Sequence, residues 1–167
     1  MPRVGYFSGV GEIRPGLEGV VAFETTIAEP DKEGGALRYR GVDIEELVGR
    51  HPFEKVWGLL VDESFDPGMP PSERLELQDP SGSVMADLQA GLATLGPKWG
   101  LKQLVDLEPA RARDDLARLS AAALSIVAQA ARGSAPSVPE PEVMKGENAA
   151  APFLIRWRGD ADPRHVH

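Results

Sequence analysis

The alanine-rich segment 109–132 constrains the fold more than any other part of the sequence. Pro109 suits the first position of a helix, and Gly133 suits the position that follows a helix end. The expected apolar stripe consists of Leu116, Leu119, Ala123, Ile126 or Val127, and Ala130. Alanines cover much of the remaining surface, and they let neighbouring helices approach closely. We therefore expect a long helix covered on more than one side, in a mainly α-helical protein.

A small β-hairpin is expected before the helices. Residues 20–28 are rich in Val, Thr, Phe and Ile, and residues 36–40 form a second extended run. The connection 29–35 is too long for a two-residue turn. Gly34 and Gly35 are therefore expected to supply the positive φ angles that let the chain enter the second strand.

After Gly41 the apolar spacing changes from two residues to about 3.6, which indicates helices. Asp43 suits the N-cap of a short helix, with Glu46 three residues later as in a capping box, and Gly49 suits its end. Pro52 suits the start of a second, strongly amphipathic helix. The apolar face of this helix consists of Phe53, Val56, Trp57, Leu60 and Val61.

The rest of the chain is expected to alternate helices with irregular segments. In order, we expect an irregular connection over 62–82, a helix over 84–95, a short helical piece over 101–105, a linker over 134–142 and a helix over 147–158. Gly96 and Pro97 are expected to end the helix over 84–95. Asp162 and Pro163 read as the start of a helix with about one turn of sequence left, which cannot overcome its nucleation cost alone. We therefore expect an N-terminal portion of a longer protein, whether an engineered or a natural truncation.

Composition excludes several classes of function. The 167 residues suit one domain, and 18 Lys and Arg against 26 Asp and Glu give a net charge of -8, which argues against nucleic-acid binding. The chain has no cysteine, a pattern compatible with a reducing cytoplasm. No run approaches the roughly 20 apolar residues of a membrane helix. We expect a cytoplasmic protein with neither nucleic-acid nor membrane partners.

The three histidines are poor candidates for catalysis or metal binding. His51 precedes Pro52 at a helix boundary, where a structural or solvated role is favoured. His165 and His167 lack the i, i+4 spacing of a helical metal clamp, so no native metal site is expected. The glycines near the N-terminus fit neither a dinucleotide fingerprint nor a phosphate loop, and no serine lies in a nucleophile elbow.

The charged residues of the hairpin and first helix have structural explanations. Arg38 and Arg40 should lie on one face of a strand with Tyr39 on the other, so an anion site is conceivable. Pairing with carboxylates such as Glu24 across the hairpin is favoured over that site. The remaining acidic residues, Asp43, Glu45 and Glu46, are expected to cap the helix and face solvent.

Several motifs resemble the citrate synthase family. Residues 16–22 (GLEGVVA), 37–41 (LRYRG), 44–47 (IEEL) and 53–57 (FEKVW) look like the N-terminal region of bacterial citrate synthases. Residues 95–100 (LGPKWG), 112–118 (ARDDLAR), 128–133 (AQAARG) and 153–157 (FLIRW) resemble the shorter citrate synthase-like proteins of high-GC Gram-positive bacteria. The resemblance covers nearly the whole chain.

The resemblance implies a multi-helical, dimeric enzyme that condenses acetyl-CoA with oxaloacetate to give citrate and CoA. The catalytic aspartate and histidines of the family and its substrate-binding arginines lie in later sequence, so no catalytic, cofactor-binding or metal residue is carried onto this chain. Acetyl-CoA is a substrate of the family rather than a cofactor bound here. The chain alone is therefore expected to be inactive. By resemblance, the helices near 84–95 and 109–132 pack against the partner subunit.

The expected organisation follows from these assignments. It comprises an N-terminal segment 1–15, a helical part 16–133 that begins with the hairpin, a proline-rich loop 134–146, and a helix with the start of another over 147–167. Many citrate synthases have a His-Pro-Met motif before the helix at 84–95, and here residues 82–86 read GSVMA, which leaves citrate or 2-methylcitrate synthesis open. Other readings are a non-catalytic dimerisation or regulatory module derived from this fold and an unrelated helical enzyme.

Overall fold

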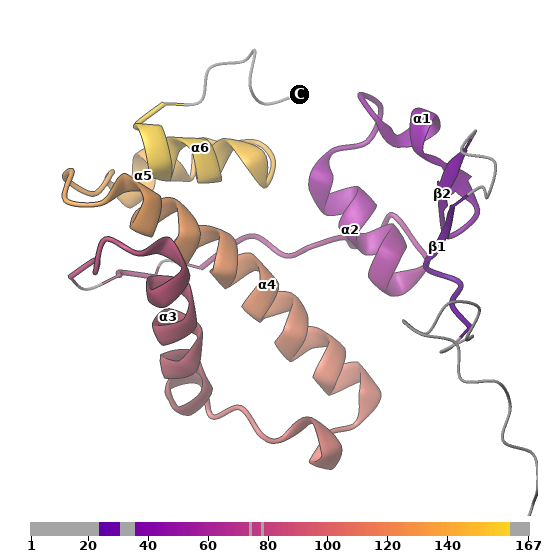
Figure 1. Ribbon diagram of the computed structural model, residues 1–167, viewed down its shortest axis with the longest axis horizontal. Coiled ribbons are helices and arrows are strands. Elements are labelled where there is room, and N and C mark those ends of the chain that lie inside the picture. The colour runs from indigo at the N-terminus through magenta and orange to yellow at the C-terminus, as the bar shows by residue number, and fades with distance from the viewer. Residues whose placement is uncertain (1–23, 31–35, 74, 78, 161–167) are drawn as a thin grey trace, which may run out of the picture.

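The computed structural model describes residues 24–30, 36–73, 75–77 and 79–160, in two groups of elements (Figure 1). The first group contains strands β1 (Ala28–Pro30), β2 (Leu37–Tyr39) and β3 (Val42–Asp43) with helices α1 (Ile44–Leu47) and α2 (Phe53–Asp62). The second contains helices α3 (Val84–Trp99), α4 (Pro109–Arg132), α5 (Glu140–Val143) and α6 (Ala150–Arg158). A short 3₁₀ helix, Leu104–Asp106, lies between α3 and α4. The mainly α-helical fold class is confirmed.

The predicted hairpin is present, but its first strand is shorter than expected and begins later, because β1 extends over the first two residues of the predicted connection 29–35. β1 and β2 pair antiparallel with Ala28 opposite Tyr39, and β3 adds to the other edge of β2. After Tyr39 the chain turns at Arg40, which has a φ of 50°. Because β2 ends at this turn, residues 24–26 have no strand to pair with, and the prediction of strand over this part of 20–28 is wrong. Residues 20–23 and the predicted turn glycines, Gly34 and Gly35, lie outside the described residues.

The two helices after the sheet form where predicted, but the predicted apolar face of α2 is partly wrong: Phe53 and Val61 are 54% and 44% exposed, and Leu59, outside that face, is buried. Asp43 caps α1, because its Oδ1 accepts a hydrogen bond from the backbone N–H of Glu45 at 3.0 Å. α2 follows Pro52 directly and ends at Asp62. Leu47 of α1 and Leu59 of α2 are buried, so both helices contribute to the core of the first group.

Helix α3 continues beyond its predicted end at Gly96 and Pro97. Pro97 lies in the last turn, where the missing backbone N–H costs one intrahelical hydrogen bond without stopping the helix. The end comes instead at Gly100, which adopts a left-handed conformation with a φ of 62°. There the N–H of Leu101 donates to the carbonyl of Gly96 at 2.9 Å, which closes the helix.

Helix α4 has the predicted bounds and is covered by α3 and α6, as expected for its small side chains (Figure 1). Ala117, Ala121 and Ala128 are buried, whereas Leu116, expected in the apolar stripe, is 47% exposed. Small side chains let the flanking helices approach α4 closely. The faces of α4 that carry alanine are therefore buried, and the predicted apolar stripe is buried only in part. The core between α3 and α4 consists of Leu95, Ala122 and Ile126, with Leu75, Leu77, Leu88, Leu92, Trp99 and Leu119 packed against them.

The end of the described chain contains one helix that the sequence did not indicate. α5 forms inside the segment predicted as a proline-rich linker, and its Val143 is fully buried. Pro141 lies in the first turn of α5. Backbone N–H groups in the first turn have no intrahelical acceptor, so the missing N–H of proline costs no hydrogen bond there. α6 begins at Ala150 rather than at residue 147, with Ala149 as its N-cap. Asn148, just before the cap, accepts a hydrogen bond from the N–H of Ala151 at 3.0 Å, which satisfies one of the free N–H groups of the first turn.

Candidate functional site

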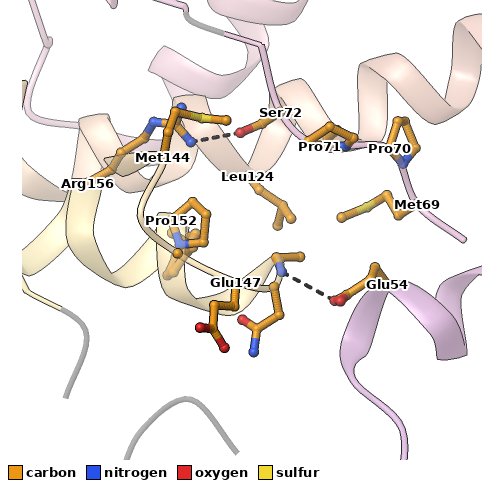
Figure 2. A pocket seen from close by; sticks show the side chains of 15 residues that line it. Glu54, Met69, Pro70, Pro71, Ser72, Leu124, Met144, Glu147, Pro152 and Arg156 are labelled. Atoms are coloured by element: carbon orange, nitrogen blue, oxygen red, sulfur yellow. Dashed lines mark hydrogen bonds between the residues drawn. The ribbon is translucent and has the colours of Figure 1, made fainter. Parts of the chain in front are cut away.

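A cavity of about 230 Å³ lies where the two groups of elements meet, and we name it the junction cavity (Figure 2). Its apolar walls come from the linker, α4 and the α5–α6 region: Met69, Pro70, Pro71, Ala121, Leu124, Met144, Pro152 and Phe153. Its polar side chains are Glu54, Ser72, Glu147, Asn148 and Arg156. Four separate elements therefore converge on one mainly apolar space with a few polar groups, which is the usual composition of a small-molecule site.

Arg156 holds the helical side of this cavity together. Its side chain is only 6% exposed, and its guanidinium bridges two other elements. Nη1 donates to Ser72 Oγ of the linker at 2.7 Å, and Nη2 donates to Glu140 Oε1 of α5 at 2.8 Å (Figure 2 shows the contact with Ser72). Both contacts stabilise the buried charge, because a buried guanidinium without partners is strongly unfavourable.

Glu54 connects α2 to the start of α6. Its Oε2 accepts a hydrogen bond from the backbone N–H of Ala149, immediately before α6, at 3.2 Å (Figure 2). A carboxylate at this position interacts favourably with the positive end of the helix dipole. The backbone carbonyl of Glu54 accepts a hydrogen bond from the N–H of Met69 at 3.0 Å. Glu54 therefore joins α2 both to the linker and to α6.

The turn at Gly68 makes this arrangement possible. Gly68 has a φ of 82°, a conformation that L side chains rarely adopt. A Cβ atom at this position would also lie 2.7 Å from the backbone carbonyl oxygen of Glu54. Glycine is therefore required for the linker to pack directly against α2 beside the cavity.

Two arginines of α4 attach the neighbouring elements to this helix. Arg113 pairs with Asp62 at the end of α2 and lies over the ring of Trp57, 5.5 Å from its centroid. Hydrogen bonding to Arg113 is the main cause that lowers the pKa of Asp62 below its ordinary value. The pair holds the first group of elements on α4.

Arg118 makes the corresponding contacts with the linker and α3. It donates two hydrogen bonds to Glu73, at 2.5 and 2.7 Å, and its guanidinium lies 3.8 Å from the ring centroid of Trp99. The hydrogen bonds from Arg118 lower the pKa of Glu73 below its ordinary value. The linker is thereby held along α4 on its way to α3.

The structure gives most of the predicted candidate residues structural roles. His51 is exposed and stacks on Phe65, with ring centroids 4.3 Å apart. Asp43 caps α1, and Glu45 and Glu46 are exposed, as predicted. His165 and His167 lie outside the described residues. Within the described ranges, no group of three His, Asp or Glu side chains is positioned to hold a metal ion.

The prediction for the arginines of the hairpin is partly wrong. Arg38 and Arg40 do not share a strand face, because Arg40 has left the strand for the turn. The predicted pairing of an arginine with a carboxylate is present at Arg40, with Glu63 as the partner at 2.8 Å rather than Glu24. Arg40 also donates to Thr26 Oγ1 and to the carbonyl of Leu60. These contacts account for the arginine without an anion ligand.

Glu54 and Arg156, which hold the cavity, were not among the candidate residues predicted from the sequence. The sequence signal for Arg156 is its position as the one charged side chain in the otherwise apolar run 153–157. A charged side chain buried in such a run needs a hydrogen-bonding or ionic partner. That partner could not be identified, because Ser72 and Glu140 lie 84 and 16 residues away in the sequence.

No helix in the described part of the chain is long and apolar enough to cross a membrane.

Comparison with known proteins identifies the family. The model named "Citrate synthase, C-terminal domain" matches residues 16–78, which include the sheet, α1, α2 and much of the linker. The chain is 56% identical over 154 residues to "Putative citrate synthase 2" of Mycobacterium tuberculosis and of Mycobacterium bovis, which covers 91% of this chain. The chain belongs to the citrate synthase family.

More distant relatives agree with this assignment. "Citrate synthase" of Acidithiobacillus ferridurans is 31% identical over 180 residues, covering 91% of this chain and 45% of the relative. "2-methylcitrate synthase 1" of Corynebacterium glutamicum is 34% identical over 84 residues, covering 50% of this chain. The chain spans only 41% of the length of the mycobacterial relatives. It therefore corresponds to a part of such proteins.

Proposed function

We propose that this chain is part of a citrate synthase-type transferase that condenses acetyl-CoA with oxaloacetate to give citrate and CoA. The observation that carries the proposal is the 56% identity, over 91% of the chain, to relatives named "Putative citrate synthase 2". The match to "Citrate synthase" of Acidithiobacillus ferridurans over 91% of the chain supports the same activity. The acceptor and donor of this reaction are substrates of the complete enzyme.

Within that enzyme the chain serves as scaffold. The described histidine, His51, is exposed and stacked on Phe65, and the buried arginine, Arg156, is engaged by Ser72 and Glu140. The sequence motifs that carry the resemblance contain none of the catalytic groups of the family. We accordingly expect the 167-residue chain alone to be inactive.

A chimera tests activity and the scaffold role together. The chain alone should release no CoA from acetyl-CoA and oxaloacetate above background. The same chain, replacing its aligned segment in the Mycobacterium tuberculosis relative, should give a protein that releases CoA at a rate within about tenfold of that relative. Turnover by the chain alone would contradict the scaffold role. A folded chimera without activity, beside an active parent, would contradict the proposed function.

Synthesis of 2-methylcitrate is the second candidate. It is favoured by the similarity of half of the chain to 2-methylcitrate synthases 1 and 2 of Corynebacterium glutamicum, at 34% and 33% identity. The chimera should be assayed with acetyl-CoA and with propionyl-CoA at equal concentrations. A higher kcat/KM for acetyl-CoA favours citrate synthesis, and a higher value for propionyl-CoA favours 2-methylcitrate synthesis.

The assembly and location of the complete enzyme follow from the same proposal. A homodimer would form through α3 and α4, whose small side chains permit close contact with other helices. A cytoplasmic location fits the absence of cysteine. A non-catalytic dimerisation or regulatory module is the alternative. It predicts a stable dimer of this chain in cells and a chimera that folds without catalysing either reaction.

A further inference from the structure

The apolar face of α2 is not buried by the described part of the chain. It consists of Phe53, Val56, Trp57, Leu60 and Val61, which form one stripe along the helix because of their spacing, and we name them the α2 stripe. Phe53 and Val61, at its two ends, are exposed, and the three residues between them are only half-buried. The side of α2 that carries most of its apolar side chains is therefore open to solvent.

The other side of α2 is fixed against the linker, so α2 cannot rotate to bury its stripe. A Cβ atom at Gly58 would lie 2.8 Å from Gly68 Cα and 2.9 Å from the carbonyl oxygen of Ser64. Leu59, next to Gly58, is buried. Rotation of α2 would bring a larger side chain to this backbone contact, where a close-packed interior leaves no space for it.

Side-chain bonds at both ends of α2 hold the same orientation. Glu54, in the first turn, accepts a hydrogen bond from the N–H of Ala149, and Asp62, the last residue, pairs with Arg113. Arg113 also lies 5.5 Å from the ring centroid of Trp57, so it contacts only the middle of the α2 stripe. The exposure of the stripe thus results from contacts along the whole helix.

The size of the α2 stripe decides between two kinds of partner. A stable interface between separate proteins uses about 20–30 residues on each side, far more than the stripe supplies. A segment of the same polypeptide needs less buried area, because its docking does not cost the translational and rotational freedom of a second molecule. This chain spans only 41% of the length of its mycobacterial relatives, so more than half of such a protein is available to supply that segment.

We propose that the α2 stripe is the docking surface for an amphipathic helix from the remaining part of the complete protein. A helix is the expected partner, because the apolar stripe of a helix in a mainly α-helical protein is buried against another helix. The docked face is apolar opposite Phe53 and Val61, since a charged group buried there would meet no polar partner in the stripe. The proposal rests on family membership and uses no step of the reaction.

Cysteine labelling tests whether the stripe is covered in the complete protein. The chain has no cysteine, so Phe53→Cys gives it a single thiol, both alone and in the chimera with the Mycobacterium tuberculosis relative. Reaction with N-ethylmaleimide is followed by mass spectrometry of the peptide that contains residue 53. The rate should be lower by about tenfold or more in the chimera, because the thiol then reacts only after local opening.

Val48→Cys is the matched control, because Val48 is an exposed apolar residue outside the stripe. Its rate should be the same in the chain and in the chimera. Equal rates for Phe53→Cys in the two proteins would overturn the proposal, even if the chimera catalyses citrate synthesis. Equal protection of both cysteines in the chimera would also overturn it, since the covering would not be specific to the stripe.

Photo-cross-linking identifies the segment that covers the stripe. The chimera carries p-benzoylphenylalanine at position 53 and is refolded from equal amounts of isotopically heavy and light chains. Cross-links should join position 53 to the remaining part of the same chain, so heavy–heavy and light–light products are expected. Heavy–light products would overturn the proposal in favour of a second copy. Cross-links confined to the 167-residue segment itself would overturn it in favour of a partner within this chain.

Discussion

Arg113 of α4 and Asp62, the last residue of α2, form a two-pronged ion pair across 51 residues of sequence. Arg113 Nε donates to Asp62 Oδ1 at 2.8 Å, and Arg113 Nη2 donates to Asp62 Oδ2. The two side chains are 25% and 20% exposed, so water screens them incompletely. The pair is a direct link between the first group of elements and the helical group, beside the bond from Glu54 to Ala149.

A double-mutant cycle should measure the strength of this link. We expect the coupling energy between Arg113→Met and Asp62→Asn to be about 1–3 kcal/mol in the free energy of unfolding, because the pair is bidentate and partly buried. The pair Glu142 and Lys145, more than half exposed on both sides, is the control. Its coupling should stay below about 0.5 kcal/mol. Equal coupling in the two pairs would show that burial and geometry do not matter here.

The stability of the chain should fall in acid because of two carboxylates. Arg113 and Arg118 hold the pKa values of Asp62 and Glu73 below their ordinary values of 3.8 and 4.5 in the folded state. The unfolded state therefore binds more protons as the pH falls, so these groups stabilise the fold fully only above their ordinary pKa values. Their contribution is lost as the pH falls through the lowered pKa values. The effect is thus present at pH 6 and declines below about pH 5.

Urea unfolding at intervals between pH 3 and pH 7 checks this prediction. The double variant Asp62→Asn, Glu73→Gln should be less stable than the unmodified chain at pH 7 and should lose less stability on acidification. Glu46→Gln, on the exposed side of α1, should leave the pH profile unchanged. A profile for the double variant parallel to that of the unmodified chain would contradict the role of these two pairs.

Gly91 sets the distance between α3 and α4. A Cβ atom at this position would lie 2.9 Å from Ile126 Cδ1 and 3.1 Å from Ile126 Cγ2. Gly91→Ala should therefore lower the free energy of unfolding by about 1–2 kcal/mol, because overpacking outweighs the better helix propensity of alanine. The added variant Ile126→Val should reduce this cost, since it removes the atom in closest contact.

Gly96→Ala in the same helix is the matched control. No atom lies within 4 Å of a Cβ placed there. Alanine should therefore stabilise the chain by up to about 1 kcal/mol through helix propensity alone. Thermal or urea unfolding of the two variants should shift in opposite directions. Equal shifts would refute the close approach of the helices at Gly91.

Arg156 should be the most sensitive charged position around the cavity. Arg156→Met removes the bridge to Ser72 and Glu140 and should cost about 2–4 kcal/mol, because it also leaves Glu140 without its partner. Arg156→Lys should restore little, since an ammonium group lacks the fork geometry that reaches both partners. Arg158→Met, which removes an exposed cation over Trp157, should cost less than about 1 kcal/mol. Urea unfolding measures all three.

The parts of the fold that the sequence predicted correctly are controlled by neighbours in the chain. The ends of α4 follow from Pro109 and Gly133, and the start of α1 follows from the cap at Asp43. These signals act over one helical turn, so no distant contact is needed to interpret them. The family could likewise be identified from motifs within short segments, and the matching relatives confirm it.

The parts that were predicted wrongly depend on contacts between distant segments. α3 continues through Pro97 because the loss of one hydrogen bond near a helix end is tolerated, and α5 forms where Val143 can be buried. Rules based on neighbouring residues treat proline and glycine as residues that end a helix. They do not include the free energy gained when a short helix buries an apolar side chain.

By itself, the sequence determined a mainly helical chain, a capped α1, the full extent of α4 and membership of the citrate synthase family. Only the tertiary structure decided which face of α4 is buried, that Arg113 and Asp62 meet, and that Glu54 and Arg156 enclose a common cavity. The reason is physical. Helix ends are set by backbone hydrogen bonds within a few residues, whereas burial and ion pairing depend on which distant surfaces come within a few ångströms of each other.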